Sequence, residues 1–261
     1  MKKELLHYVA AGNGPPVILI HGMAASLHDW EALLPELVPA GFRAYAPDLL
    51  GHGDSAKPDD PRLYHSRAVF ACFEEWLESL GLTEPPVLIG HSLGGYLSLR
   101  YSLRHPEKLR ALVLVDPLYS PNQLSPLLRV LQRRPGLGTK ALQLVPEWMI
   151  HTVIGWDPTI ATNFSHRARL QIASDLKRAS PQILYIPRTV RDLTPKLPKV
   201  TQRTLVIWGE KDLTLRPASF PTLVAQLPAA DGQVVPGCGH QPHIGKPELV
   251  NRAVLNFLKR L

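Results

Sequence analysis

The sequence predicts an α/β protein with a mostly parallel central sheet, helices on both faces of that sheet and an inserted helical cap. Two observations support this prediction. Short runs of apolar residues alternate with stretches of helical periodicity, and these runs are apolar throughout, as expected for strands covered on both faces. The alternation stops between residues 117 and 199, where ten prolines interrupt a helical pattern and no convincing strand is found.

The predicted strands are β-branched or otherwise apolar runs that end at Gly, Asp or Pro. They cover residues 17–20, 43–46, 87–89, 111–115, 204–208 and 233–235, with an antiparallel edge strand at 5–9. Helices are predicted at residues 29–40, 64–81, 93–105, 216–228 and 246–260. A chain of 261 residues is compatible with two domains or with one core that carries an insertion. The pattern favours a core of residues 1–116 and 200–261, with residues 117–199 inserted as the cap.

Composition excludes several classes of protein. With 45% hydrophobic residues, 20% charged residues and a mean hydropathy of −0.04, the chain is expected to be globular, and neither disordered nor collagen-like. Residues 1–20 lack the uninterrupted apolar run of a signal peptide, and no window reaches the ~18 apolar residues of a membrane span. The only two cysteines, Cys72 and Cys238, are typical of a reducing compartment, so we expect a cytoplasmic protein with free thiols.

Positive charge is concentrated in the predicted cap. The formal net charge is +7, and residues 117–200 contain twelve Lys or Arg against four Asp or Glu. This local excess either attracts an anionic or lipid-like substrate or serves only as a solvated surface. No nucleic acid partner is expected, because no nucleic-acid-binding motif or interleaved aromatic residues accompany the basic residues.

Ser92 lies in a Gly-x-Ser-x-Gly motif that joins the strand predicted at 87–89 to the helix predicted at 93–105. A serine at such a turn has a strained backbone, and its Oγ projects above the sheet. The N-terminal amides of the following helix lie beside it, so the N–H of Leu93 can point at an oxyanion that develops there. Ser92 is therefore the candidate nucleophile.

A serine nucleophile requires a histidine base. His240 is the preferred candidate because it lies in a glycine-containing loop after the last predicted strand, and His243 is its rival. The His-x-x-His spacing of this pair also resembles part of a metal site. No Cys, Asp or Glu at ligand spacing completes such a site, so we expect neither a metal nor a cofactor.

The base in turn requires an acid that orients it. Asp212 is preferred because it follows the strand predicted at 204–208, and Glu210 and Asp116 are the alternatives. With Asp212, the chain order is serine, acid, histidine.

The chain resembles α/β-hydrolases of the lidded, esterase-like group over essentially its whole length. Besides the serine motif, residues 21–26 are similar to the His-Gly loop of that family, and residues 48–55 resemble its Asp-x-x-Gly-x-Gly-x-Ser turn. The resemblance implies the α/β-hydrolase fold. It also implies that the backbone N–H of Met23 joins that of Leu93 in an oxyanion hole.

The resemblance further implies acyl transfer, because haloalkane dehalogenases and epoxide hydrolases of this family carry aspartate where this chain has Ser92. We expect a serine hydrolase for carboxylic esters with an apolar acyl part, in which His240 transfers the proton and Asp212 orients His240. One alternative is hydrolysis of a carbon–carbon bond beside a ketone. Another is a signal receptor that retains the triad but turns over slowly.

Substrate choice is expected to depend on the cap. Trp148 and Met149 of the cap, together with His21 and His91 of the core, are the candidate pocket residues. The apolar cap residues alternatively serve to pack the cap onto the core. The expected partner is a small-molecule ester or acyl compound, and the sequence indicates no particular oligomeric state.

Overall fold

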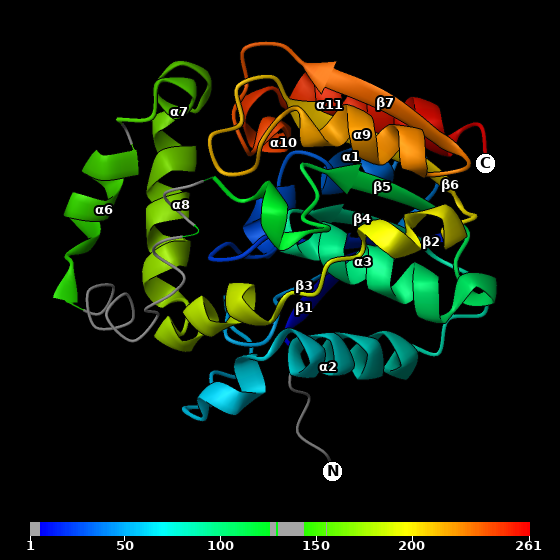
Figure 1. Ribbon diagram of the computed structural model, residues 1–261, viewed down its shortest axis with the longest axis horizontal. Coiled ribbons are helices and arrows are strands. Elements are labelled where there is room, and N and C mark those ends of the chain that lie inside the picture. The colour runs from blue at the N-terminus through cyan, green and yellow to red at the C-terminus, as the bar shows by residue number, and fades with distance from the viewer. Residues whose placement is uncertain (1–5, 126–128, 130–143, 155) are drawn as a thin grey trace.

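Seven short segments pair into one sheet in the computed structural model, which describes residues 6–125, 129, 144–154 and 156–261 (Figure 1). The strand order is β1-β3-β2-β4-β5-β6-β7. Strand β1 pairs antiparallel with β3, and the remaining pairs are parallel. The strands are β1 (Tyr8–Ala11), β2 (Pro16–Ile20), β3 (Arg43–Pro47), β4 (Val87–His91), β5 (Ala111–Val115), β6 (Arg203–Gly209) and β7 (Ala230–Val235). The predicted α/β fold with a mostly parallel sheet is confirmed.

Alternating side chains of each central strand enter two separate cores. In β2, Val17 and Leu19 pack on one face of the sheet, whereas Ile18 and Ile20 pack on the other. All four side chains are fully buried, which explains why this strand is apolar throughout and not alternately polar.

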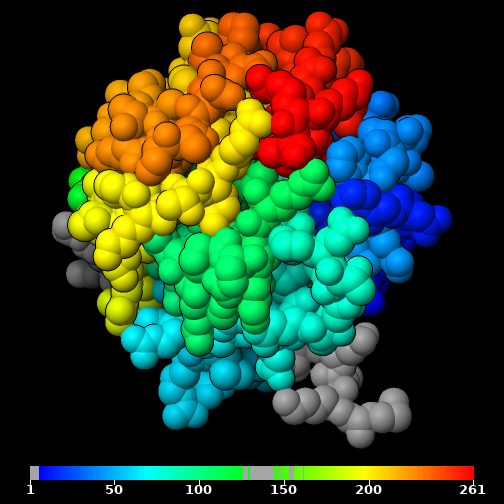
Figure 2. Space-filling model, turned by 90° about the vertical axis from the view of Figure 1, so that its right-hand side faces the viewer, coloured from blue at the N-terminus to red at the C-terminus, as the bar shows by residue number. Residues whose placement is uncertain are grey.

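Helices cover both faces of the sheet (Figure 1). They are α1 (Leu34–Leu37), α2 (Ser66–Ser79), α3 (Leu93–Arg104), α6 (Glu147–Ile154), α7 (Pro158–Asn163), α8 (His166–Arg178), α9 (Ser219–Gln226), α10 (Pro242–Gly245) and α11 (Pro247–Leu258). Buried side chains of α2, α3 and α9 share one core, and those of α1 and α11 share the other. Figure 2 shows the side of the molecule turned away from α6 and α8, where α2, α3 and α11 lie at the surface.

The N-terminal part of the chain differs from the prediction in two places. The edge strand begins at Tyr8, whereas the prediction began at residue 5, which lies outside the described residues. The helix predicted at 29–40 is divided into a 3-10 turn, η1 (Leu27–Trp30), and the short α1. Proline explains the division, because Pro35 is the second residue of α1 and Pro39 follows this helix, and neither residue supplies the backbone N–H that a longer helix needs.

Between β5 and β6, the described residues form α6, α7 and α8, the 3-10 segments η5 (Pro181–Thr189) and η6 (Thr194–Lys199), and a short 3-10 turn, η4 (Pro121–Gln123). In Figure 1, α6, α7 and α8 stand to one side of the sheet. Within the segment predicted as the cap, the basic residues Arg133 and Arg134 and the apolar residue Leu142 lie outside the described residues. Within the described part of the chain, every helix is too short or too polar to cross a lipid bilayer.

Replacement of Gly94 by alanine is expected to destabilise the fold by about 1–3 kcal/mol. A Cβ at position 94, in the first turn of α3, would overlap the backbone oxygen of Ile20 in β2. This clash outweighs the ~1 kcal/mol that alanine normally contributes to a helix. Urea denaturation measures the difference in the free energy of unfolding.

Gly232→Ala is the matched control, because a Cβ there would meet only side-chain atoms of Val224 and Trp208. We expect its effect to stay below ~1 kcal/mol. Equal effects of the two substitutions would contradict the proposed backbone clash.

Candidate active site

Ser92 occupies a sharp turn between β4 and α3. Its backbone has φ +49° and ψ −108°, a conformation that a residue with a side chain adopts only when its surroundings enforce it. Two hydrogen bonds fix this turn: the Ser92 N–H donates to Val115 O at 3.0 Å, and the Leu118 N–H donates to Ser92 O at 3.0 Å. Gly90 permits the turn to close, because a Cβ there would lie 2.5 Å from the carbonyl carbon of Gly94.

The structure brings His240 to Ser92. His240 lies in the loop that follows β7, and its Nε2 is 3.0 Å from Ser92 Oγ. Its Nδ1 is 2.7 Å from Asp212 Oδ2, so the two ring nitrogens link the hydroxyl to the carboxylate. The side chain is 17% exposed, which leaves the ring accessible from one side.

Asp212 is held in place by the loop that follows β6. Its Oδ1 accepts hydrogen bonds from the N–H groups of Thr214 at 2.7 Å and Leu215 at 3.0 Å, which leaves Oδ2 for His240. Burial of the carboxyl raises its pKa, but the His240 charge and these hydrogen bonds outweigh burial and hold the pKa of Asp212 below its usual value. Asp212 is therefore ionised at neutral pH.

A second buried acid, Asp116, lies beside Asp212 at the end of β5. Its Oδ1 accepts from the Gly209 N–H at 3.0 Å, and the carboxylates of both acids and a His240 nitrogen lie within 4.8 Å of one another. Burial, and next the charge of Asp212, raise the pKa of Asp116 well above its usual range. The pKa values of the two acids are thus shifted in opposite directions, and Asp212, whose pKa is lowered, is the acid that contacts the imidazole.

The loop with Met23 packs against the serine turn. A Cβ at Gly22 would lie 3.3 Å from Ser92 Cβ, so the loop approaches Ser92 closely. Ala24 follows with φ +61°, which turns the chain sharply. Within the described residues, no protein acceptor receives a hydrogen bond from the backbone N–H of Met23 or of Leu93. Both groups are therefore available to a negatively charged oxygen.

The two core histidines predicted for the pocket have specific partners. His21 Nε2 accepts from the Leu49 N–H at 2.9 Å and its Nδ1 lies 2.6 Å from Gly22 O, so both nitrogens bind backbone. His91 donates from Nε2 to the backbone oxygen of His240 at 2.8 Å. Burial of the imidazole is the largest influence on its pKa and lowers the pKa of His91 to about 4. Both histidines support loops of the site and do not present a free nitrogen to its open side.

The two predicted cap residues lie on α6 and largely face solvent. Trp148 is 67% exposed and Met149 39%, whereas the adjacent Ile150 is buried. Helix α7, in the segment predicted as the cap, contacts the loop that carries His240: Asn163 Nδ2 donates to Gly237 O at 3.0 Å. The role of Trp148 and Met149 in a substrate pocket stays a prediction.

Asp29 is a residue near the site that the sequence did not single out. It lies in η1, and His91 and His243 both approach its carboxylate. No motif marks this position, since its partners are 62 and 214 residues further along the chain. Only the fold places the three residues together.

Comparison with known proteins identifies relatives along nearly the whole chain. A model of the alpha/beta hydrolase fold family matches residues 15–247. A 2-hydroxy-6-oxo-6-phenylhexa-2,4-dienoate hydrolase of Burkholderia cepacia is 28% identical, over 97% of this chain and 91% of that protein. Bifunctional epoxide hydrolase 2 of Rattus norvegicus is 26% identical over 97% of this chain, which spans 53% of that longer protein. A thermophilic esterase from Thermogutta terrifontis has a similar structure, with a TM-score of 0.83, 26% identity and coverage of 98% and 93%.

Asp116→Asn is expected to change how stability depends on pH. Because the folded-state pKa of Asp116 is raised, this group stabilises the fold below its unfolded-state pKa of ~3.9, and that contribution is lost as the pH rises. The free energy of unfolding of the wild type, relative to that of Asp116→Asn, should therefore fall as the pH rises above about 4. Urea denaturation across this range measures it. Asp231→Asn, at an exposed carboxylate, controls for the loss of one charge, and a difference that is independent of pH would contradict the raised pKa.

Proposed function

Because the chain belongs to the alpha/beta hydrolase fold family, we propose that it is a serine hydrolase that cleaves carboxylic esters with an apolar acyl part. The observation that carries this proposal is the row of side chains Ser92, His240 and Asp212, with successive distances of 3.0 Å and 2.7 Å. These distances are within hydrogen-bonding range for proton transfer from the hydroxyl to the imidazole.

The proposed reaction has two halves. Ser92 Oγ attacks the ester carbonyl while its proton passes to His240 Nε2, and the Met23 and Leu93 N–H groups stabilise the tetrahedral oxyanion. His240 then returns the proton to the departing alcohol, which leaves an acyl group on Ser92. Water, activated by His240, releases the acid and restores the serine. Asp212 stays ionised throughout and stabilises the charged imidazole.

We propose that residues 117–199 form the cap over this site and select a small-molecule ester. The basic character of this segment supports an anionic or lipid-like substrate. In the described part of the cap, Arg178 pairs with Asp54 of the core, so this cation is engaged in a cap-to-core contact. The free thiols of Cys72 and Cys238 are consistent with a cytoplasmic location.

A second candidate is hydrolysis of a carbon–carbon bond beside a ketone. It is favoured by the Burkholderia cepacia relative, whose name denotes hydrolysis of an oxo-dienoate. A slow-turnover receptor with a retained triad is a third. We do not propose epoxide hydrolysis, because Ser92 replaces the aspartate expected for that chemistry.

Rapid release of p-nitrophenol from short- or medium-chain acyl esters is the expected activity. Ser92→Ala should reduce kcat by at least ~10³-fold, since the nucleophile is lost. A fluorophosphonate probe should label Ser92 in the wild type only, as peptide mass spectrometry would show. Slow ester cleavage together with rapid loss of 2-hydroxy-6-oxo-dienoate absorbance would instead support carbon–carbon hydrolysis, and slow turnover of both compounds would support a receptor.

The two buried acids are expected to differ sharply in their effect on kcat. Asp212→Asn should lower kcat by ~10⁴-fold, because the amide favours the wrong tautomer of His240. Asp116→Asn is the matched control, and we expect a change of less than ~10-fold, since Asp116 binds the Gly209 N–H and the amide oxygen of asparagine can accept the same hydrogen bond. Steady-state kinetics on one ester measures both. The reverse order would make Asp116 the orienting acid.

A further inference from the structure

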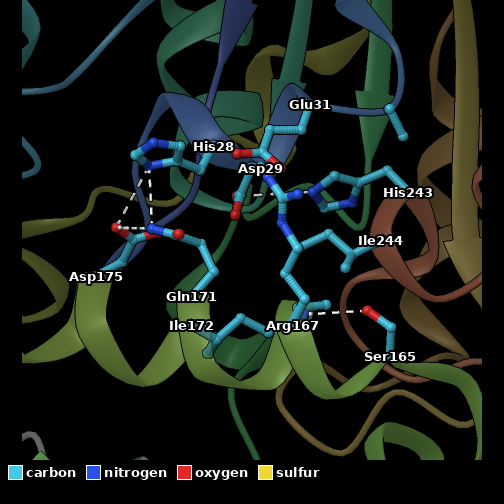
Figure 3. Close-up of a pocket in the computed structure, with 12 residues that line it drawn as sticks. His28, Asp29, Glu31, Ser165, Arg167, Gln171, Ile172, Asp175, His243 and Ile244 are labelled. Carbon is cyan, nitrogen blue, oxygen red and sulfur yellow. Dashed lines mark hydrogen bonds and ion pairs between the residues drawn. The ribbon is translucent and has the colours of Figure 1, made fainter.

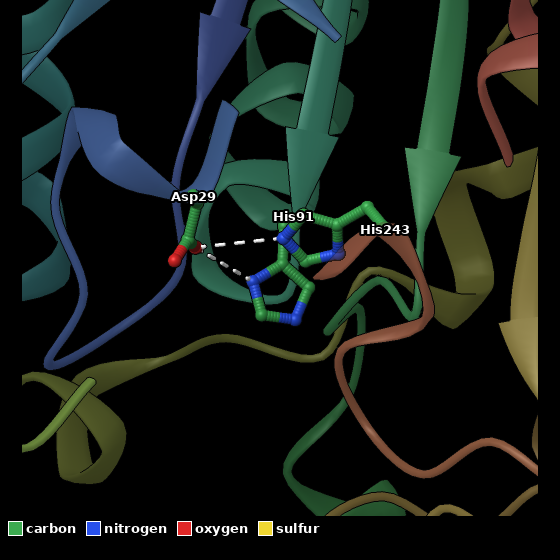
Figure 4. A group of neighbouring side chains, drawn as sticks. All are labelled: Asp29, His91 and His243. Carbon is green, nitrogen blue, oxygen red and sulfur yellow. Dashed lines mark ion pairs between the residues drawn. The ribbon is translucent and has the colours of Figure 1, made fainter. Parts of the chain in front are cut away.

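Asp29, His91 and His243 form a buried cluster next to the proposed triad (Figure 4). Their side chains are 3%, 3% and 1% exposed. Asp29 Oδ2 lies 3.5 Å from His91 Nδ1 and 3.6 Å from His243 Nε2, and the three atoms are all within 4.8 Å of one another. The cluster joins three separate segments: η1, the end of β4 and α10.

The atoms that face one another in this cluster have no hydrogen-bond partners. Within the described residues this holds for Asp29 Oδ2, His91 Nδ1 and both ring nitrogens of His243. Buried polar atoms without a partner are costly and uncommon. Three of them, Asp29 Oδ2, His91 Nδ1 and His243 Nε2, approach one another, and a positively charged group among them would satisfy all three.

The hydrogen bond of His91 determines the sign of the charge that can occupy the space between the three side chains. Its Nε2 donates to His240 O, so in the neutral ring Nδ1 carries a lone pair. This lone pair and the Asp29 carboxylate are both acceptors, and they would repel each other across 3.5 Å. A cation between them satisfies both atoms at once.

We propose that Asp29 Oδ2, His91 Nδ1 and His243 Nε2 bind a divalent cation with the ligand preferences of zinc. Two imidazoles and one carboxylate suit this ion and leave a fourth position for water. Zinc–ligand bonds of ~2.0–2.2 Å in a tetrahedron separate neighbouring ligand atoms by ~3.4 Å. The two distances to Asp29 Oδ2, 3.5 Å and 3.6 Å, agree with that separation.

The surroundings of the cluster fit a metal ion. Gly22 leaves space beside the nitrogen of His91, because a Cβ there would lie only 2.7 Å from Nδ1. The bond from His91 Nε2 to a backbone oxygen is the outer contact that metal-binding histidines normally make. A cavity of about 170 Å³ between η1 and α8 is lined by Asp29 and His243 and gives access from solvent (Figure 3). Glu31 and Asp175 also line this cavity, where Glu31 pairs with Arg167 and Asp175 lies beside His28.

Zinc titration of the full chain tests the proposal. After treatment with a chelator, the wild type is expected to bind about one Zn²⁺ per chain in calorimetry. Its thermal unfolding temperature should rise with Zn²⁺, since the site exists only in the folded state. Co²⁺ in place of Zn²⁺ should give the strong visible absorption of a four-coordinate ion. Absence of stoichiometric binding to the folded wild type would overturn the proposal and leave a shared proton as the charge in the cluster.

Variants locate the bound ion. Asp29→Asn keeps the shape of the side chain but removes its charge, and it should weaken Zn²⁺ binding by at least ~100-fold. His243→Gln should do the same. Asp175→Asn is the matched control, because it changes a buried acid of the same cavity outside the cluster, and its Zn²⁺ affinity should equal that of the wild type. Circular dichroism confirms the fold of each variant.

Two other groups of side chains must also be tested as ligands. Asp116, Asp212 and His240 form one, and His7, Asp48 and Asp54 form the other. His240→Asn and His7→Asn should both retain Zn²⁺ binding. Loss of binding in either variant, or unchanged affinity in Asp29→Asn, would place the ion elsewhere and overturn the proposal. If Asp29→Asn fails to fold, the Zn²⁺ titration of the wild type still decides whether the folded chain binds the ion.

Discussion

Parallel pairing of β4, β5, β6 and β7 is the constraint on which the rest of the site depends. Neighbouring parallel strands end at the same edge of a sheet, so the loops that follow them meet there. Ser92, Asp116, Asp212 and His240 each follow one of these four strands. Ser92 Oγ and His240 Nε2 are thereby brought to 3.0 Å although 148 positions separate the two residues. The strained backbone at Ser92 is held by its hydrogen bonds with Val115, at the end of the neighbouring strand β5, and with Leu118.

Local sequence patterns predicted the fold and three members of the site because each pattern coincides with a strand end. The acid was harder to assign, since Glu210, Asp212 and Asp116 all follow strands. Hydrogen bonding distinguishes them in the structure. The carboxylate of Glu210 accepts from the Gly237 N–H at 2.8 Å, Asp116 accepts from the Gly209 N–H, and Asp212 contacts His240. Such a division of roles depends on side-chain direction, which spacing along the chain does not encode.

Contacts between distant segments account for what the sequence did not predict. No carboxylate lies at ligand spacing from His240 and His243 in the sequence, but the fold brings Asp29 Oδ2, from the opposite end of the chain, to 3.6 Å from His243 Nε2. The helix predicted at 29–40 failed for a different reason, because apolar periodicity continued across prolines that the backbone cannot accommodate in one helix. In the segment predicted as the cap, apolar character alone did not distinguish the buried Ile150 from the exposed Trp148.

The contact of α7 with the loop that carries His240 has a mechanical consequence. Asn163 holds Gly237 by a hydrogen bond, and Thr159 lies so close to Gly239 that a methyl group there would overlap its hydroxyl. These two points lie on either side of Cys238, within the four residues that separate β7 from His240. A rigid displacement of α7 therefore moves this loop and changes the distance between His240 Nε2 and Ser92 Oγ. This distance thus depends on the position of α7.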